Sequence, residues 1–325
     1  MKIAMTGSYP KGTGGRNSPD LKTLRLRWER GEIQEDVLLG AYQQATRQAI
    51  REQEEAGTDI VTDGLIRWED PLALIAARLE GMELGKLQSF LGSPFFYRQP
   101  VVVGRIRRER PLVLQEFVFA MGAATRELKQ VIPGPVTMAY LSEDRHYGNL
   151  ERMVYDLSEA LSSEILALEA AGAAQIQVDE PVLGFEPGLT ELVRESLKVL
   201  QGESSVRMAL HTYFGDIFPA LTQVASMPVD AVGLDMTQTG TRAEILKAIE
   251  MMDWDKDLAL GCVNGCSTEL EDPDTLKALW DRAQKAVGEN EIYVGPQCGM
   301  GTLTRAQAWK KLNHLSTAVL DWRGF

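Results

Sequence analysis

Eight short apolar runs rich in β-branched residues recur along the 325-residue chain, separated by stretches with helical periodicity. This alternation predicts parallel strands joined by helices. Eight such strands predict a single (β/α)8 TIM barrel that forms one domain over residues 1–325. The runs are Ile3–Met5, Asp59–Thr62, Pro135–Met138, Gln175–Val178, Arg207–Leu210, Ala231–Leu234, Leu258–Gly261 and Ile292–Gly295.

Other segments carry their own local signals. Apolar spacing predicts helices over 36–56, 114–131 and 151–171. The aromatic and β-branched stretch Phe95–Gly104 interrupts the strand–helix rhythm without a helix before it, and it predicts an inserted β-hairpin near residues 90–105. The Gly-rich segment 11–15 has no Lys-Ser/Thr ending, so we interpret it as an active-site loop rather than a phosphate cradle.

Nearly every apolar run stops at a residue that can do chemistry. These residues are Ser8, Asp63, Tyr140, Asp179 with Glu180, His211, Asp235, Cys262 with Cys266, and Cys298. TIM barrels carry their sites at the C-terminal ends of the strands. We therefore expect His, Asp and Cys side chains to converge on one point, as a metal site requires.

Composition excludes several classes of protein. A net charge of −12 argues against nucleic-acid binding. No apolar stretch approaches the roughly 18 residues of a membrane span, and the segment before Gly7 is too short for a signal peptide. Three cysteines cannot build a full disulfide framework, so we expect reduced thiols. A cytoplasmic protein without membrane or nucleic-acid partners is predicted.

Adjacent carboxylates follow the run Gln175–Val178. Asp179 and Glu180 are costly to bury together unless they bind something positive. A salt-bridged pair that stabilises the rim of the barrel is the alternative. His211 follows the next run, and we expect it to face Cys298 across the same mouth.

Taken in order, these segments resemble the catalytic half of cobalamin-independent methionine synthase. The similar segments are Thr6–Pro10, Leu24–Arg27 with Gly31–Ile33, Thr62–Gly64, Gly134–Met138, Gln177–Pro181 and Gly295–Met300. They follow the family's order over the whole chain. Because only the catalytic barrel is represented, the chain resembles the short, core-type form.

The resemblance implies methyl transfer to a thiol, normally that of homocysteine, which a zinc ion binds and holds as a thiolate. The family's zinc ligands are a His-x-Cys pair, a Glu and a late Cys. His211 and Cys298 match, whereas Asp235 stands at the Glu position and Tyr213 at the Cys position. A phenol is a poor zinc ligand. We hypothesise that Cys266 compensates, which gives the metal set His211, Asp235, Cys266 and Cys298.

Substrate recognition carries over in part. Ser8 and Asp179 match positions that hold the family's amino-acid substrate, and Asp63 is predicted to bind substrate with them. Leu65 replaces a family Glu that would meet the substrate ammonium. Asp179, Glu180 and Cys266 are the predicted catalytic residues.

The donor end departs further from the family. Leu141, which we predict to bind the donor, replaces a Trp that packs on folate, and Cys266 replaces a His associated with proton transfer. A folate nitrogen must be protonated as it leaves, whereas a corrinoid leaves as cob(I)alamin without a proton. Core-type members of the family are known to favour corrinoid donors. We therefore predict methylcobalamin or a corrinoid protein as donor.

Two alternatives remain open from the sequence. The first is a zinc-dependent alkyltransferase acting on another thiol, which Leu65 favours and Ser8 and Asp179 oppose. The second is a barrel without catalysis that binds a corrinoid or a partner protein. Tyr213, Leu65 and Leu141 favour it.

Overall fold

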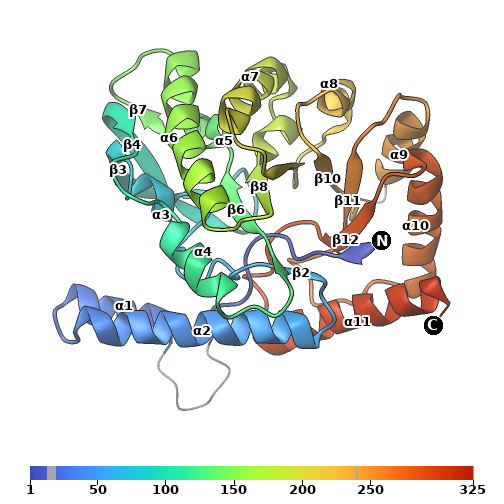
Figure 1. The fold of residues 1–325 in the computed structure, drawn as a ribbon, viewed down its shortest axis with the longest axis horizontal. Coiled ribbons are helices and arrows are strands. Elements are labelled where there is room, and N and C mark those ends of the chain that lie inside the picture. The colour runs from blue at the N-terminus through green and yellow to red at the C-terminus, as the bar shows by residue number, and fades with distance from the viewer. Residues whose placement is uncertain (13–19, 239, 325) are drawn as a thin grey trace.

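The structure is a computed structural model, and it describes residues 1–12, 20–238 and 240–324. Most of the Gly-rich segment 11–15 lies outside these ranges. Strands and helices alternate along the chain, which makes the fold α/β (Figure 1). The strands are β1 (Lys2–Ile3), β2 (Ile60–Val61), β3 (Glu80–Ser89), β4 (Phe96–Arg107), β5 (Glu127–Leu128), β6 (Gln130–Pro133), β7 (Glu143–Asp144), β8 (Gln175–Asp179), β9 (Arg207–His211), β10 (Ala231–Asp235), β11 (Asp257–Val263) and β12 (Ile292–Pro296).

Seven of the described strands form a parallel sheet in the order β1-β12-β11-β10-β9-β8-β6. Both faces of these strands are covered, and their residues are almost all buried. That is the environment in which continuous apolar runs are typical of parallel sheets. From β8 to β12, strands that follow one another in the chain are also parallel neighbours in the sheet, so each connection between them is a crossover.

The described helices join these strands and, in Figure 1, surround the sheet. α2 and α11 run along the lower side of that view. In α6 the buried side chains include Met153, Leu157, Leu161 and Ile165, which is the predicted helical stripe. The helices are α1 (Leu21–Glu29), α2 (Glu35–Glu55), α3 (Ala73–Ala76), α4 (Leu114–Met121), α5 (Pro135–Tyr140), α6 (Leu150–Ala170), α7 (Thr190–Gln201), α8 (Leu221–Ala225), α9 (Arg242–Glu250), α10 (Pro273–Val287) and α11 (Arg305–Arg323).

The third predicted strand is wrong. Pro135–Met138 lies in helix α5, and the strand precedes it as β5 and β6. Pro135 is well suited to the first turn of a helix, where its missing N–H needs no partner. The predicted helix over 114–131 is correspondingly too long, because α4 ends at Met121 and the chain then enters β5.

A separate three-stranded sheet, β3-β4-β7, occupies the region where a hairpin was predicted. β3 and β4 pair antiparallel from Glu80↔Arg107 to Ser89↔Phe96. The paired strands begin about ten residues earlier than the predicted segment, and residues 90–95 connect them. Tyr97 is buried and its hydroxyl donates to the Leu141 carbonyl at 2.9 Å, which fastens this sheet to the end of α5.

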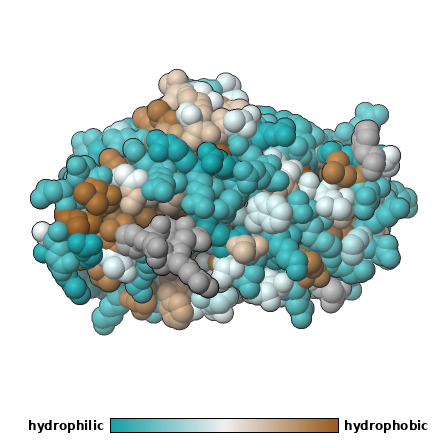
Figure 2. Space-filling view, turned by 90° about the horizontal axis from the view of Figure 1, so that it is seen from below, coloured by the Kyte–Doolittle hydropathy of each residue, from teal (hydrophilic) through white to brown (hydrophobic). Residues whose placement is uncertain are grey.

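The face beneath the molecule in Figure 1 is mainly hydrophilic, and its hydrophobic patches are small and separate (Figure 2). The described ranges contain no helix that combines the length and the apolar composition of a membrane span.

A buried carboxylate joins the second sheet to the helices. Glu164 of α6 is inaccessible to solvent, and it accepts hydrogen bonds from Arg108 Nε at 2.6 Å, Val113 N at 2.6 Å and Leu114 N at 2.8 Å. It thereby pairs the cation that follows β4 and caps the first turn of α4.

We expect Glu164→Ala to lower the free energy of unfolding by about 3–5 kcal/mol, because it leaves the half-buried Arg108 guanidinium and the N–H groups of Val113 and Leu114 without their shared partner. Urea denaturation followed by circular dichroism measures the change. Glu159→Ala, at an exposed position of the same helix, is the matched control. Equal stability of the two variants would contradict the stabilising role of Glu164 between the second sheet and the helices.

Candidate active site

A cavity of about 240 Å³ opens where the parallel strands end. Its walls come from the segments that follow β1, β2, β6, β8, β9 and β12, together with the β3–β4 connection. The polar lining residues include Ser8, Lys11, Thr137, Asp179, Tyr213, Cys298 and Thr302. The apolar lining residues include Leu65, Trp68, Leu72, Phe90, Phe95, Phe96, Val131 and Phe214.

Asp179 is the central acid of this cavity. Its carboxylate accepts hydrogen bonds from Gln177 Nε2 at 2.7 Å and from the Tyr213 hydroxyl at 3.0 Å. Burial raises the pKa of Asp179 to about 6, although both hydrogen bonds oppose that rise. Burial and the neighbouring carboxylate also raise the pKa of Tyr213 well above its usual value. Tyr213 is therefore a neutral donor to Asp179.

Ser8 reaches the cavity on the loop after β1. Its carbonyl accepts from Met300 N at 2.6 Å, so this loop lies against the segment that follows Cys298. A Cβ atom on Gly299 would lie 2.2 Å from Ser8 Oγ. It would also lie 2.8 Å from Ser8 N, so glycine at this position, after β12, gives the Ser8 backbone and hydroxyl the room they occupy.

Two thiols meet beside the cavity. Cys266 Sγ lies 3.8 Å from Cys298 Sγ, and neither forms a disulfide. Their hydrogen bond lowers the pKa of Cys266 and raises the pKa of Cys298, which burial raises further. Cys266 is thus the first of the pair to ionise. It lies outside the lining of the cavity, whereas Cys298 is part of the lining.

The four predicted zinc ligands are not gathered into one group. His211, still within β9, is buried, and its ring packs over Gly233 of β10, where an added Cβ would lie 2.4 Å from Nδ1. Burial lowers the pKa of His211 well below its usual value, so the ring is neutral. Among the described residues, no three His, Cys, Asp or Glu side chains are placed to hold a metal.

Asp235 is engaged by its own turn. Its Oδ1 accepts from Thr237 N at 2.9 Å and Thr237 Oγ1 at 2.6 Å, and its Oδ2 accepts from Phe214 N at 3.4 Å. These contacts connect the end of β10 to the segment after β9. The negative charge of Asp235 also raises the pKa of both thiols, which places it in their neighbourhood.

Glu180 points away from the cavity. Its side chain is inaccessible, and its two oxygens accept from Val136 N at 2.9 Å and Thr137 N at 2.7 Å. It fills the space beside Gly134, where an added Cβ would lie 2.1 Å from its carboxyl carbon. Burial raises the pKa of Glu180 to about 7. These contacts anchor α5 to β8, and a catalytic role for Glu180 stays a prediction.

Leu141 and Asp63 are also outside the cavity lining. Leu141 is buried under the Tyr97 hydroxyl. Asp63 lines a second cavity, of about 130 Å³, with Arg67 and Glu116. Its Oδ1 accepts from Leu65 N at 2.9 Å, which shapes the turn that carries Leu65 into the main cavity. Roles in binding substrate stay predictions for both residues.

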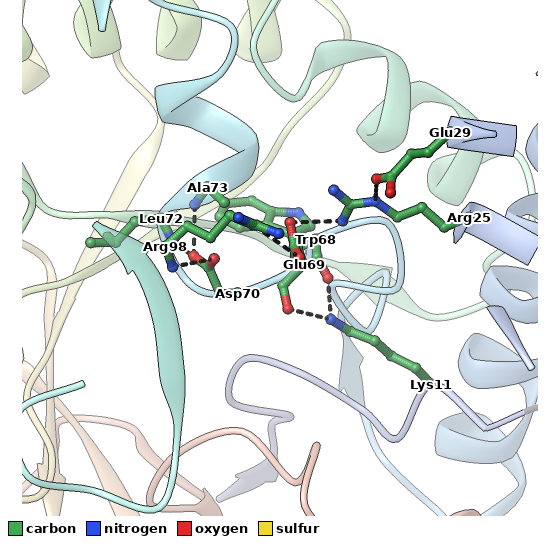
Figure 3. Close-up of polar contacts among 9 residues, drawn as sticks. All are labelled: Lys11, Arg25, Glu29, Trp68, Glu69, Asp70, Leu72, Ala73 and Arg98. Atoms are coloured by element: carbon green, nitrogen blue, oxygen red, sulfur yellow. Dashed lines mark hydrogen bonds and ion pairs between the residues drawn. The ribbon is translucent and has the colours of Figure 1, made fainter. Parts of the chain in front are cut away.

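The cavity mouth contains a polar cluster that sequence reasoning missed (Figure 3). Glu69 pairs with Arg25 at 2.8 Å and with Arg98 at 3.3 Å. The ammonium of Lys11 donates to the carbonyls of Trp68 and Glu69, and burial lowers its pKa to about 8. The segment Trp68–Glu69 after β2 was the sole signal for this cluster, because its partners come from distant parts of the chain.

Asp70 completes the cluster, and its carboxylate binds backbone N–H groups rather than a charged side chain. It accepts from Leu72 N at 2.8 Å, Ala73 N at 2.7 Å and Arg98 N at 2.9 Å (Figure 3). It therefore starts α3 and ties the loop after β2 to β4. This fixes the loop that carries Trp68 and Leu72 in the cavity wall.

The buried carboxyl of Asp63, which accepts from Leu65 N, makes the stability of the protein depend on pH in a way that can be tested. Burial raises its pKa from 3.8 to about 6, and the charge of nearby Glu116 adds to the rise while Arg67 opposes it. The folded protein therefore keeps a proton that the unfolded chain has already released between these two values. Stability must fall as pH rises through that interval and level off above it.

We expect wild type to lose up to about 3 kcal/mol of unfolding free energy relative to Asp63→Asn between about pH 4 and about pH 7. Asparagine keeps the carbonyl that accepts from Leu65 N but cannot titrate. Urea denaturation across the pH range measures the difference, with Asp216→Asn at an exposed turn as control. Parallel pH profiles for wild type and Asp63→Asn would refute the raised pKa.

Comparison with known proteins gives one consistent answer. Residues 1–319 match the family model "Cobalamin-independent synthase, Catalytic domain". The methionine synthase of Methanothermobacter marburgensis is 30% identical over 99% of this chain and 100% of its own length, and that of Sulfurisphaera tokodaii is 29% identical over 96% and 89%.

Solved structures agree on the fold. A B12-independent methionine synthase from Shewanella sp. W3-18-1, in complex with selenomethionine, superposes with a TM-score of 0.86 at 21% identity and covers 99% of this chain and 98% of that one. A methyltransferase from Methanosarcina mazei has a TM-score of 0.64 at 16% identity, covering 99% and 94%. Since the family model spans nearly the whole chain, this protein belongs to the family of cobalamin-independent methionine synthase catalytic domains and is a methyltransferase.

Proposed function

We propose that this enzyme transfers a methyl group to the thiol of homocysteine and so forms methionine. The observation that carries the proposal is the cavity at the strand ends, where Ser8, Asp179 and Cys298 share one lining. All three match positions for which the family resemblance implies substrate or metal contacts. The Asp179 carboxylate suits a substrate ammonium, and the Ser8 hydroxyl suits a carboxylate or an ammonium.

The protein groups have distinct tasks in this reaction. Tyr213 and Gln177 orient Asp179, so that its charge faces the cavity rather than the sheet. The buried wall formed by Leu65, Trp68 and Leu72 excludes water from the thiol. A thiolate is the nucleophile in methyl transfer, and a cation at this position would favour it over the thiol.

Zinc fits the thiol pair of this site. Two sulfurs bound tetrahedrally to zinc at about 2.3 Å lie about 3.8 Å apart, which is the separation of Cys266 and Cys298. We propose that both thiols hold zinc; His211 and Asp235, the other two ligands predicted from the sequence, are not gathered with them in this structure. When bound, zinc would supply a positive charge that lowers the pKa of a coordinated thiol. Tyr213 is excluded as a ligand because its hydroxyl is committed to Asp179.

The donor that we propose is a methylated corrinoid, either methylcobalamin or a corrinoid protein. Two departures from the family support this: Cys266 stands in place of a His, and Leu141 stands in place of a Trp. Leu141 is buried beside Tyr97, and its aliphatic side chain lacks the flat ring with which the family's Trp packs on folate. The matching family is described as cobalamin-independent, so the donor is the sharpest point on which this chain is expected to differ.

A second candidate function has one observation in its favour. Leu65, which replaces a family Glu, lines the cavity and removes a carboxylate from the substrate site. A thiol without an ammonium group would suit that wall better than homocysteine. A panel of thiols with and without an α-amino group, offered with the same donor, separates the two candidates.

We also infer that the strands close into a complete (β/α)8 barrel formed by one domain. β2 supplies the contacts that support closure: Ala4 bridges to Ile60, Met5 N donates to Ile60 O at 2.9 Å, and Lys129 N donates to Val61 O at 3.0 Å. β2 thus contacts the segment after β1 on one side and β5, with Lys129 that leads into β6, on the other. Three free cysteines suit a reducing compartment, and we propose a cytoplasmic location.

We expect purified protein to contain about one zinc per chain, and Cys298→Ser and Cys266→Ser each to lose most of it. Metal analysis and X-ray absorption measure the content and the number of sulfur ligands, which should rise when homocysteine is added. Cys262→Ala, at a buried thiol outside the cavity, is the control. Full zinc content in the Cys266→Ser, Cys298→Ser double variant would disprove this ligand pair.

For the reaction itself, we expect methionine to form from homocysteine and methylcobalamin, and at least tenfold more slowly from methyltetrahydrofolate. Quantifying methionine by mass spectrometry, with Asp179→Asn as a site control, measures both rates. Asparagine removes the charge that suits the substrate ammonium, so the KM for homocysteine should rise. Efficient use of methyltetrahydrofolate would overturn the corrinoid donor and leave the methyltransferase assignment intact.

A further inference from the structure

Three phenylalanine side chains line the cavity and keep part of their surface exposed to solvent. Phe95 and Phe96 come from the end of the β3–β4 connection and the start of β4, and Phe214 follows β9. Phe96 is 60% exposed, whereas Phe95 and Phe214 are partly buried. The rings of Phe95 and Phe214 lie 5.9 Å apart and are inclined by 36°. We call these three residues the aromatic rim.

The backbone holds the aromatic rim in place from both sides. Phe214 has a φ of +75°, which L-residues rarely adopt, and its N–H and carbonyl are both bound, to Asp235 at 3.4 Å and to Gln238 at 2.8 Å. Leu91, in the connection that carries Phe95, has a φ of +50°. Strained residues of this kind persist where the surrounding structure fixes them, and they concentrate at ligand sites.

The cavity behind the aromatic rim is small. Its volume of about 240 Å³ is below the range of about 300–1,000 Å³ that encloses a drug-sized ligand. It suits an amino-acid-sized thiol. A methyl donor with a large ring system cannot enter beside that thiol, so it must present its methyl group from the mouth.

Charge at the mouth argues against an anionic donor. The cations Lys11, Arg25 and Arg98 already contact the carbonyls or the carboxylate of Glu69 and its neighbours (Figure 3). Within the part of the mouth that the structure describes, Lys11 and Arg25 are therefore engaged by the protein's own oxygens rather than left for the carboxylates of a folate. Aromatic rings instead offer flat apolar surface and favour stacking with another ring system.

We propose that the aromatic rim is the docking platform for the corrin ring of a methylated corrinoid, whose methyl group then faces the thiol in the cavity. This inference rests on the proposed function and names where its donor binds. The cobalt–carbon bond breaks with both electrons left on cobalt, which goes from Co(III) to Co(I). The sulfur lone pair forms the new S–CH3 bond, and the thiol proton passes to solvent.

Equilibrium dialysis against methylcobalamin tests the platform without relying on turnover. We expect Phe95→Ala and Phe96→Ala each to raise the Kd for methylcobalamin five- to tenfold, and homocysteine binding, followed by calorimetry, to stay unchanged. Phe96 is mostly exposed, so its removal leaves the fold intact. Met251→Ala, an apolar residue that is 79% exposed at the end of α9, is the control.

Each result assigns or removes the platform. An unchanged Kd for methylcobalamin in both variants would overturn the proposal, and so would an equal loss of homocysteine binding. Weaker binding of methyltetrahydrofolate, but not of methylcobalamin, in the variants would assign the rim to a folate. If the rim variants weaken methylcobalamin binding and wild type does not methylate homocysteine, the platform stands and the proposed function fails.

Discussion

The parallel register of the strands is the constraint on which the site depends. Pro133 lies opposite Asp179, Asp179 opposite His211, and Asp235 opposite Gly261. Because neighbouring strands end nearly level, whatever follows each strand is delivered to the same edge of the sheet. Residues as distant as Ser8 and Cys298 share one cavity for this reason alone.

This constraint also explains what the sequence could predict. Apolar runs separated by helical periodicity indicated seven of the parallel strands, and the residues that follow them included Ser8, Asp179 and Cys298. The prediction of the third strand was wrong because Gly134-Pro135-Val136 has the apolar residues typical of a strand but begins helix α5. Besides Pro135 in the first turn, Glu180 at the end of the neighbouring strand favours the helix, because its carboxylate accepts from the first N–H groups of α5. No local pattern reports a cap that lies 44 residues away.

The predicted zinc set shows a second limit. A strand end fixes the edge of the sheet at which a side chain lies, but not its height above that edge or its direction. His211 is still inside the sheet against Gly233, while Tyr213, two residues further, reaches Asp179. Asp235 uses its oxygens on the turn that follows it. A shift of one or two residues along the chain thus decides which side chains can meet. Side-chain packing sets these positions, and the spacing of residues in the sequence does not report it.

Tyr213 reaches Asp179 from the segment after β9, which the shorter side chain of a cysteine at the same position could not do. A buried hydroxyl must find an acceptor, because leaving it unpaired costs about 1–3 kcal/mol. Asp179 is that acceptor. Tyr213 stands where the resemblance implies a zinc-binding Cys, and it therefore also holds Asp179, the carboxylate that we propose faces the substrate. With Tyr213 bound to Asp179, the thiols of Cys266 and Cys298 are the softest possible metal ligands near the cavity. A substitution of Tyr213 is therefore expected to change both metal binding and the position of Asp179.

Residues with strained backbone conformations are concentrated around the cavity. The described non-glycine residues with positive φ are Leu65, Leu91 and Phe214, and all three belong to the cavity wall or to the connection above it. Conformations of this kind cost on the order of 1–3 kcal/mol each. Hydrogen bonds that Leu65 N donates to Asp63 and Phe214 N donates to Asp235 offset part of that cost. Two aspartates predicted to contact substrate or metal directly thus act on the site through the backbone, by setting the turns that shape its apolar walls.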